Sequence, residues 1–151
     1  MTDGHDGLLA ALAALFPATP RQRCLVHKQR NVMSSIPKRE QPEVQAELTG
    51  IWKQETKAEA LLNLAVFQAK YQKRYPEAVR SLMEDDAHLL TFYDFPPVMH
   101  RYIRTTNAIE SFFSNVRQRT DQIDTFTTEM SCLIIVWAVM QDIRLPKIPV
   151  G

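Results

Sequence analysis

The stretch Gln22-Arg23-Cys24-Leu25-Val26-His27 is the one part of this 151-residue chain whose pattern indicates a β-strand. One strand cannot satisfy its own backbone hydrogen bonds, and the residues before Asp3 are too few to supply a partner of useful length. Either the stretch is not a strand, or its sheet lies upstream of Met1 in a longer protein. We favour the second alternative.

Helical patterns fill most of the remaining chain. Apolar residues recur every three or four positions, and prolines separate one such segment from the next. The helices that we expect cover about residues 8–16, 44–52, 58–75, 79–90, 107–116 and 127–143. The last of these is apolar on nearly every side, so we expect it to be almost entirely buried.

The composition is that of an ordinary globular protein of one domain. Because 18 Lys and Arg balance 17 Asp and Glu, net charge alone indicates neither a nucleic-acid nor a membrane partner. Two cysteines are too few for a disulfide framework, and the longest apolar run, Cys132 to Met140, is too short to cross a bilayer. The first residues lack the basic region of a signal peptide. We therefore expect a soluble, cytoplasmic domain.

Basic residues nevertheless gather in two places. Six of them, with no acid, lie between residues 21 and 39, and a second group surrounds Glu110. Such patches suit the phosphate backbone of DNA, although a solvated surface is the plainer explanation for either patch alone. The candidate phosphate contacts are Arg21, Arg23, Lys28, Arg30, Arg104, Arg117 and Arg119.

Two acids stand where a metal ligand is plausible. Asp3 lies directly before an amphipathic helix; the alternative is that Asp3 or Asp6 only caps this helix. Glu110 lies at the rim of the apolar stripe of another helix, with Arg117 two turns further on. It could instead belong to a capping box that begins at Asn107, or to a surface ion pair. Spacing alone leaves these alternatives open.

Cys24 and His27 form a Cys-x-x-His pair inside the expected strand. Structural zinc usually needs four ligands, and the other Cys and His residues form no second close pair. A nucleophilic Cys–His dyad is disfavoured because side chains three positions apart on a strand point to opposite faces. We expect the pair to pack and to help to position the strand.

In this order the motifs resemble the mutator-type transposases of bacterial insertion sequences. The resemblance runs from Thr2 to about Ile143 and rests on TDGHDGL (residues 2–8), QRCLVHKQRNV (22–32), LTFYDFP (90–96) and RYIRTTNAIES (101–111). It implies a mostly α chain with a remnant of an α/β ribonuclease-H-like core, and an Asp, Asp, Glu catalytic triad. The implied parts are a core helix and strand (residues 1–33), a helical insertion between the second Asp and the Glu (34–100), and the Glu-bearing and C-terminal helices (101–145).

Carried over by motif, Asp3 matches the second catalytic Asp, Glu110 matches the Glu, and Cys24 with His27 match the family's Cys-x-x-His signature. The resemblance implies two-metal DNA strand cleavage and transfer with Mg²⁺ or Mn²⁺, transposon ends and target DNA as partners, and a homo-oligomer as a further possibility. The family's first Asp has no counterpart here, so we expect the carboxy-terminal part of a transposase catalytic domain that is inactive alone. The alternatives are a non-catalytic helical module that binds DNA or a partner, and a degenerate fragment.

Overall fold

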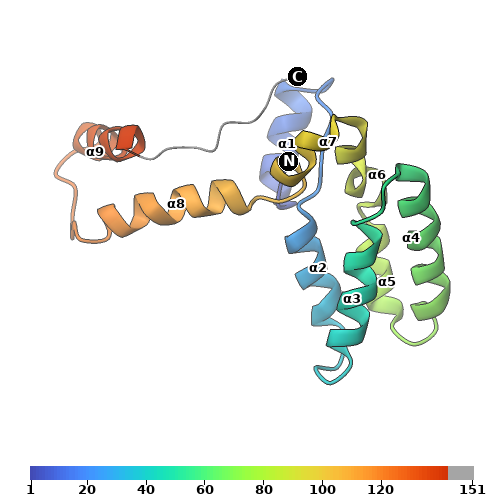
Figure 1. Ribbon diagram of the computed structural model, residues 1–151. Helices are drawn as coiled ribbons and strands as arrows, with labels where there is room; N and C mark the ends of the chain where they lie inside the picture. Colours follow the sequence, from blue (N-terminus) through green and yellow to red (C-terminus); the bar gives the residue numbers. More distant parts are fainter. Residues whose placement is uncertain (143–151) are drawn as a thin grey trace. The chain divides into compact units, whose positions relative to one another are not determined.

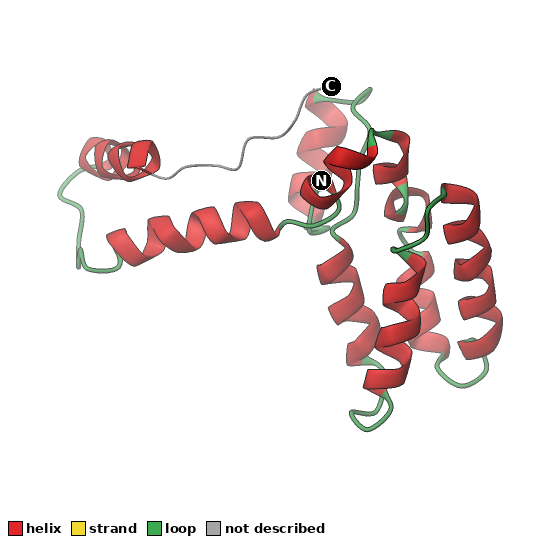
Figure 2. Cartoon of the chain, viewed as in Figure 1, coloured by secondary structure: helices red, strands yellow, loops and turns green. Residues whose placement is uncertain are grey.

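The computed structural model describes residues 1–142, which form two units, Met1–Thr105 and a second that begins at Thr106 (Figure 1). Unit 1 contains a 3-10 helix, η1 (Thr91–Asp94), and the α-helices α1 (Asp6–Leu15), α2 (Leu25–Ser34), α3 (Gln41–Ile51), α4 (Lys57–Tyr71), α5 (Pro76–Met83), α6 (Asp86–Leu89) and α7 (Pro97–Ile103). Unit 2 contains α8 (Asn107–Thr120) and α9 (Glu129–Asp142). The prediction of a mostly α chain is therefore confirmed (Figure 2).

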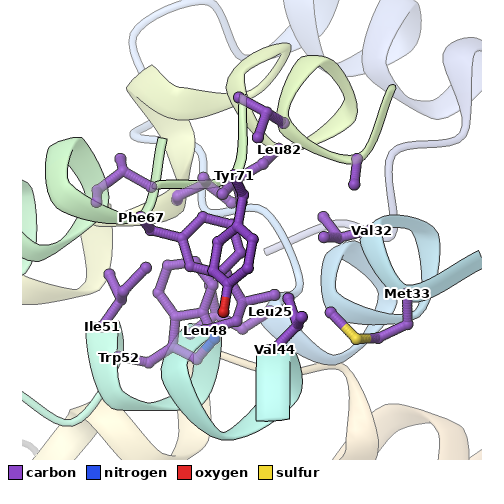
Figure 3. Close-up of a cluster of buried hydrophobic side chains, with 14 of the residues drawn as sticks. Leu25, Val32, Met33, Val44, Leu48, Ile51, Trp52, Phe67, Tyr71 and Leu82 are labelled. Carbon is purple, nitrogen blue, oxygen red and sulfur yellow. The ribbon is translucent and has the colours of Figure 1, made fainter. Parts of the chain in front are cut away.

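The core of unit 1 lies among α2, α3, α4 and α5 (Figure 3). In α4, for example, Ala60, Leu64, Phe67 and Tyr71 recur at helical spacing and are all buried. Thr56 and Glu59 form a capping box at the start of this helix, and Pro76 occupies the first turn of α5. These local signals explain why the helical pattern of the sequence predicts this region well.

The expected strand from Gln22 to His27 is wrong over its second half. Leu25 begins α2, so Leu25–His27 are helical. The reason is that Leu25, Lys28, Val32 and Met33, the buried residues of α2, follow helical spacing over a longer stretch than the apparent strand. What remains of the strand is a single parallel bridge between Thr2 and Arg23. Thr2 N–H donates to the carbonyl oxygen of Gln22 over 2.9 Å, and Cys24 N–H donates to that of Thr2 over 2.7 Å.

Two further expectations need correction. The helix expected over residues 79–90 ends at Met83 and resumes in α6, while α7 lies in a segment for which no helix was expected. Helix α9 forms where expected but is not buried, since Leu133, Ile134 and Trp137 are exposed. A helix that is apolar on every side needs partners on every side, and within the described part of unit 2 α9 packs against α8 alone.

Candidate functional site

Asp3 follows the bridge residue Thr2 directly, and its side chain is exposed. Its carboxylate oxygen Oδ1 accepts a hydrogen bond of 3.1 Å from the backbone N–H of His5, which is the N-cap residue of α1. Asp6 is the first residue of the helix, and the N-cap makes no side-chain hydrogen bond. The expectation that Asp3 or Asp6 serves as the N-cap is therefore wrong, and Asp3 instead orders the turn that leads into α1.

Gly4 completes this turn, and both its backbone conformation and its close neighbour favour a residue without a side chain. Its φ of +88° lies in the left-handed region, which favours glycine. A Cβ atom at Gly4 would lie 1.8 Å from Nη1 of Arg23, so the guanidinium group lies directly against the turn. Arg23 thus lies against the turn with its side chain and is joined to the backbone next to Asp3 by its bridge to Thr2.

Arg23 and Lys28, both buried, share the partly exposed carboxylate of Asp85 in unit 1. Arg23 Nε lies 3.0 Å from Oδ2 of Asp85, and Lys28 Nζ lies 2.6 Å from the same oxygen. Lys28 Nζ also donates to the carbonyl oxygen of Ser81 over 2.6 Å. Burial acts to raise the pKa of Asp85, but the hydrogen bond and charge of Lys28, together with Arg23, outweigh it and lower this pKa below its ordinary value. The cluster ties the Asp3 turn to the segment between α5 and α6.

This cluster revises the list of candidate phosphate contacts. Arg23 and Lys28 are buried, and the side chain of Lys28 is only 2% exposed. Both pair with Asp85, so we assign them to the fold and not to a DNA surface. Of the other candidates, Arg30, Arg117 and Arg119 are exposed, and Arg21 and Arg104 are half-buried.

Cys24 and His27 meet at the start of α2. Cys24 is fully buried and is the N-cap residue of this helix, and His27 Nδ1 lies 3.3 Å from Cys24 Sγ. The expectation that their side chains point to opposite faces is wrong, because the two residues lie on one helical turn and not on a strand. A role in positioning remains a prediction, and the backbone at this point indicates how it would work.

Consecutive peptide groups at this junction hold two distant segments. Cys24 N–H donates to the carbonyl oxygen of Thr2 over 2.7 Å, and Leu25 N–H donates to that of Arg104 over 3.0 Å. Thr2 immediately precedes Asp3, and Arg104 is the C-cap residue of α7, six residues before Glu110. The Cys24–Leu25 junction therefore brings the backbone that leads to each candidate acid to one place within unit 1.

Glu110 lies in the first turn of α8 and is half-buried. The hydroxyl group of Thr106 donates a hydrogen bond to its carboxylate oxygen Oε1. Thr106 is the N-cap residue and makes no side-chain cap, so the alternative of a capping box at Asn107 is wrong. Because Glu110 belongs to unit 2 and Asp3 to unit 1, their meeting at one site stays a prediction.

Sequence patterns did not single out several residues that the structure makes important. Asp85 is one of four acids in a short run, with nothing to distinguish it before its partners are known. Thr106 precedes Glu110 by one helical turn, which is the only signal for its role. A groove of about 530 Å³ also lies along α2 and α3, lined by Val26, Gln29, Arg30, Met33, Ser34, Gln41 and Gln45.

The described residues also bear on metal binding and on membrane insertion. Within residues 1–142, His, Cys, Asp and Glu side chains do not gather in groups of three or more that could hold a metal ion. No helix described in that range combines the length and the apolar character needed to cross a membrane.

Comparison with known proteins establishes the family. The chain belongs to the Mutator family of transposases. The sequence model of this family, described as "Transposase, Mutator family", matches residues 1–145. It is 43% identical over 139 residues to the transposase for insertion sequence element IST2 of Acidithiobacillus ferrooxidans, covering 92% of this chain and 47% of the relative. It is 40% identical over 118 residues to the transposase for insertion sequence element IS6120 of Mycolicibacterium smegmatis, and this match covers 78% of this chain and 36% of the relative. The chain thus spans half or less of the length of these relatives, and the resemblance to the family is confirmed.

Proposed function

We propose that this chain supplies part of the catalytic centre of an insertion-sequence transposase, in which the carboxylates of Asp3 and Glu110 act together in cleaving and joining DNA strands. The observation that carries this proposal is the Cys24–Leu25 junction. Its two consecutive N–H groups bind the carbonyl oxygens of Thr2 and Arg104, so the segments that lead to the two acids start from neighbouring points. Consecutive Cα atoms are about 3.8 Å apart, which makes this a close anchorage.

The chemistry of the two side chains suits a hard divalent cation. Both offer carboxylate oxygens, which Mg²⁺ and Mn²⁺ prefer, and neither is fully buried. Two nearby carboxylates repel each other unless a cation lies between them. Bound there, such ions would activate the attacking water or 3′-hydroxyl and stabilise the leaving oxygen. The Thr106 hydroxyl group would hold the Glu110 carboxylate in a fixed orientation.

We propose that a further strand completes this centre in the whole protein. The N–H and C=O groups of Thr2 point towards residues 22–24, so those of Asp3 point to the opposite side of its strand. A parallel strand paired there would carry the remaining Asp of the triad beside Asp3. In this placement Thr2 and Arg23 would belong to two neighbouring strands of a ribonuclease-H-like sheet. The hydrogen bond from Arg23 N–H to the carbonyl oxygen of His88 would cover the outer edge of the strand that contains Arg23.

DNA would meet the exposed basic residues. Arg30 stands beside the groove along α2 and α3, whose glutamine side chains are also suited to contacts with phosphate and sugar. Arg117 and Arg119 occupy the last turns of α8, the helix that carries Glu110. We expect these residues, with Arg21 and Arg104, to contact transposon ends or target DNA in the bacterial cytoplasm.

The test is metal-dependent nicking and strand transfer by the whole protein on DNA that carries the transposon ends. We expect Asp3→Asn and Glu110→Gln to abolish both reactions and to leave DNA binding intact. Asp6→Asn, in the same turn and also exposed, is the matched control and should retain activity. Full activity of both variants would show that Asp3 and Glu110 are not the catalytic acids, whereas DNA binding by the unaltered protein without nicking or strand transfer would favour a non-catalytic DNA-binding module.

A further inference from the structure

Helix α4 carries a second apolar face that the described part of unit 1 leaves exposed. The side chains of Leu61, Leu62 and Val66 are 51%, 64% and 58% exposed. Three exposed alanines lie on the same side, so that the face, which we call the outer stripe, consists of Ala58, Leu61, Leu62, Ala65, Val66 and Ala69. At 100° per residue the stripe spans about 140° and lies opposite the face that packs into the core.

The outer stripe has the spacing of a seam between two helices. Ala58, Leu62, Ala65 and Ala69 are separated by four, three and four positions, which is the heptad spacing. Residues 60–69 contain no charged side chain, so a DNA backbone, which Lys and Arg recognise, does not fit this face. Figure 1 shows α4 at the edge of the α2–α5 bundle, where another helix can reach it.

We propose that α4 pairs in antiparallel orientation with α4 of a second copy of this chain, about a two-fold axis. The register that matches the stripe to itself places Leu62 of one copy opposite Ala65 of the other. The same register places Ala58 opposite Ala69, while Leu61 and Val66 flank the seam on its two sides, each beside its own counterpart in the other copy. At the centre of the seam the large Leu62 thus meets the small Ala65, and the two-fold axis repeats every contact.

Charges at the two ends of α4 favour the antiparallel orientation. Lys57 pairs with Asp94, and Lys70 pairs with Glu47, so both lysines are neutralised within unit 1. Glu55 before the helix and Lys73 after it are exposed and form no ion pair among residues 1–142. Antiparallel pairing brings Glu55 of one copy to Lys73 of the other, whereas parallel pairing would bring like charges together. This complementarity is why we choose a second copy as the occupant.

Sedimentation of the 151-residue chain over a range of concentrations tests the pairing. Because the stripe covers one helix of 15 residues, we expect a dimer that dissociates on dilution. Leu62→Glu should raise the dissociation constant at least about tenfold, and circular dichroism should show that the variant keeps its helices. Leu133→Glu, at an equally exposed position of α9, is the control and should leave dimerisation unchanged.

Charge exchange tests the orientation. We expect Glu55→Lys alone and Lys73→Glu alone each to weaken the dimer about threefold, and the double variant to restore it. Three results would overturn the proposal: a monomer at every concentration, association that Leu133→Glu abolishes and Leu62→Glu does not, or a double variant no stronger than the single ones. None of these results depends on catalytic activity, so the proposed transposase function is tested separately.

Discussion

Thr2 and Arg104 accept hydrogen bonds from consecutive backbone amides, those of Cys24 and Leu25. More than a hundred residues separate them in the sequence, and each leads within a few residues to a candidate acid. Cys24 lies at this point fully buried, with His27 against its sulfur atom. The Cys-x-x-His motif is therefore placed where it would fix the N-terminus of α2, and with it both anchored segments.

The Asp3 turn should depend strongly on Gly4. A side chain at this position is strained by the positive φ and also clashes with the guanidinium group of Arg23. Gly4→Ala should therefore lower the free energy of unfolding by about 2 kcal/mol or more. Gly50→Ala is the control, because a Cβ at Gly50 in α3 meets no atom within 4 Å. Denaturant unfolding should show the control unchanged or slightly stabilised. Equal stability of the two variants would contradict the role of Gly4.

The buried cluster makes a second prediction. Asp85→Asn leaves Arg23 and Lys28 buried without their counter-charge, so unfolding should become easier by about 3 kcal/mol. Asp86→Asn changes the neighbouring, exposed acid and should alter stability by less than about 0.5 kcal/mol. Chemical denaturation measures both variants. If Asp86→Asn cost as much as Asp85→Asn, the cluster would not be the cause.

The same cluster predicts a pH dependence. The pKa of Asp85 is lowered in the folded chain, so its contribution to stability is fully present above its unfolded pKa of about 3.9. The contribution is lost as the pH falls through the lower, folded pKa. The difference in unfolding free energy between the native chain and Asp85→Asn should therefore be constant from about pH 5 to 7 and shrink below about pH 4. A difference that grew on acidification would have the wrong sign for this account.

DNA affinity should separate exposed from buried basic residues. Arg30→Ala, Arg117→Ala and Arg119→Ala should each weaken binding and reduce the slope of log affinity against log salt by about one. Lys53→Ala, at an exposed position outside both patches, should change neither quantity. Fluorescence anisotropy at several salt concentrations measures the slope. An identical loss for Lys53→Ala would show that the effect is one of total charge only.

The sequence predicts the helices well where a long stripe is present. Ala60, Leu64, Phe67 and Tyr71 repeat over three turns of α4, and this helix formed where expected, although it ends at Tyr71 and not at Tyr75. The six residues from Gln22 to His27 are too few to distinguish a strand from the start of a helix, because Leu25 belongs to a helical stripe that continues to Val32 and Met33. The pattern of buried positions over residues 25–33 favours the helix α2.

The roles of charged residues were harder to predict. Arg23 and Lys28 look like surface cations in the sequence, and only the fold brings Asp85 from about sixty positions away to pair with both of them. Glu110 and Asp3 could be proposed because the family resemblance, not their spacing, singles them out. Local patterns carry no information on which distant residue will become a partner.

The convergence of Asp3 and Glu110 is tested most directly by pulsed electron spin resonance. Spin labels would be attached at positions 3 and 110 of the whole protein, after Cys132→Ser; Cys24 is buried. Labels at positions 3 and 121 provide the reference, because Asp121 lies about 16 Å further along the axis of α8. We predict that the 3–110 pair shows a narrow distribution, centred at a shorter distance than the 3–121 pair. A 3–110 distance equal to or longer than the 3–121 distance would contradict a shared catalytic centre.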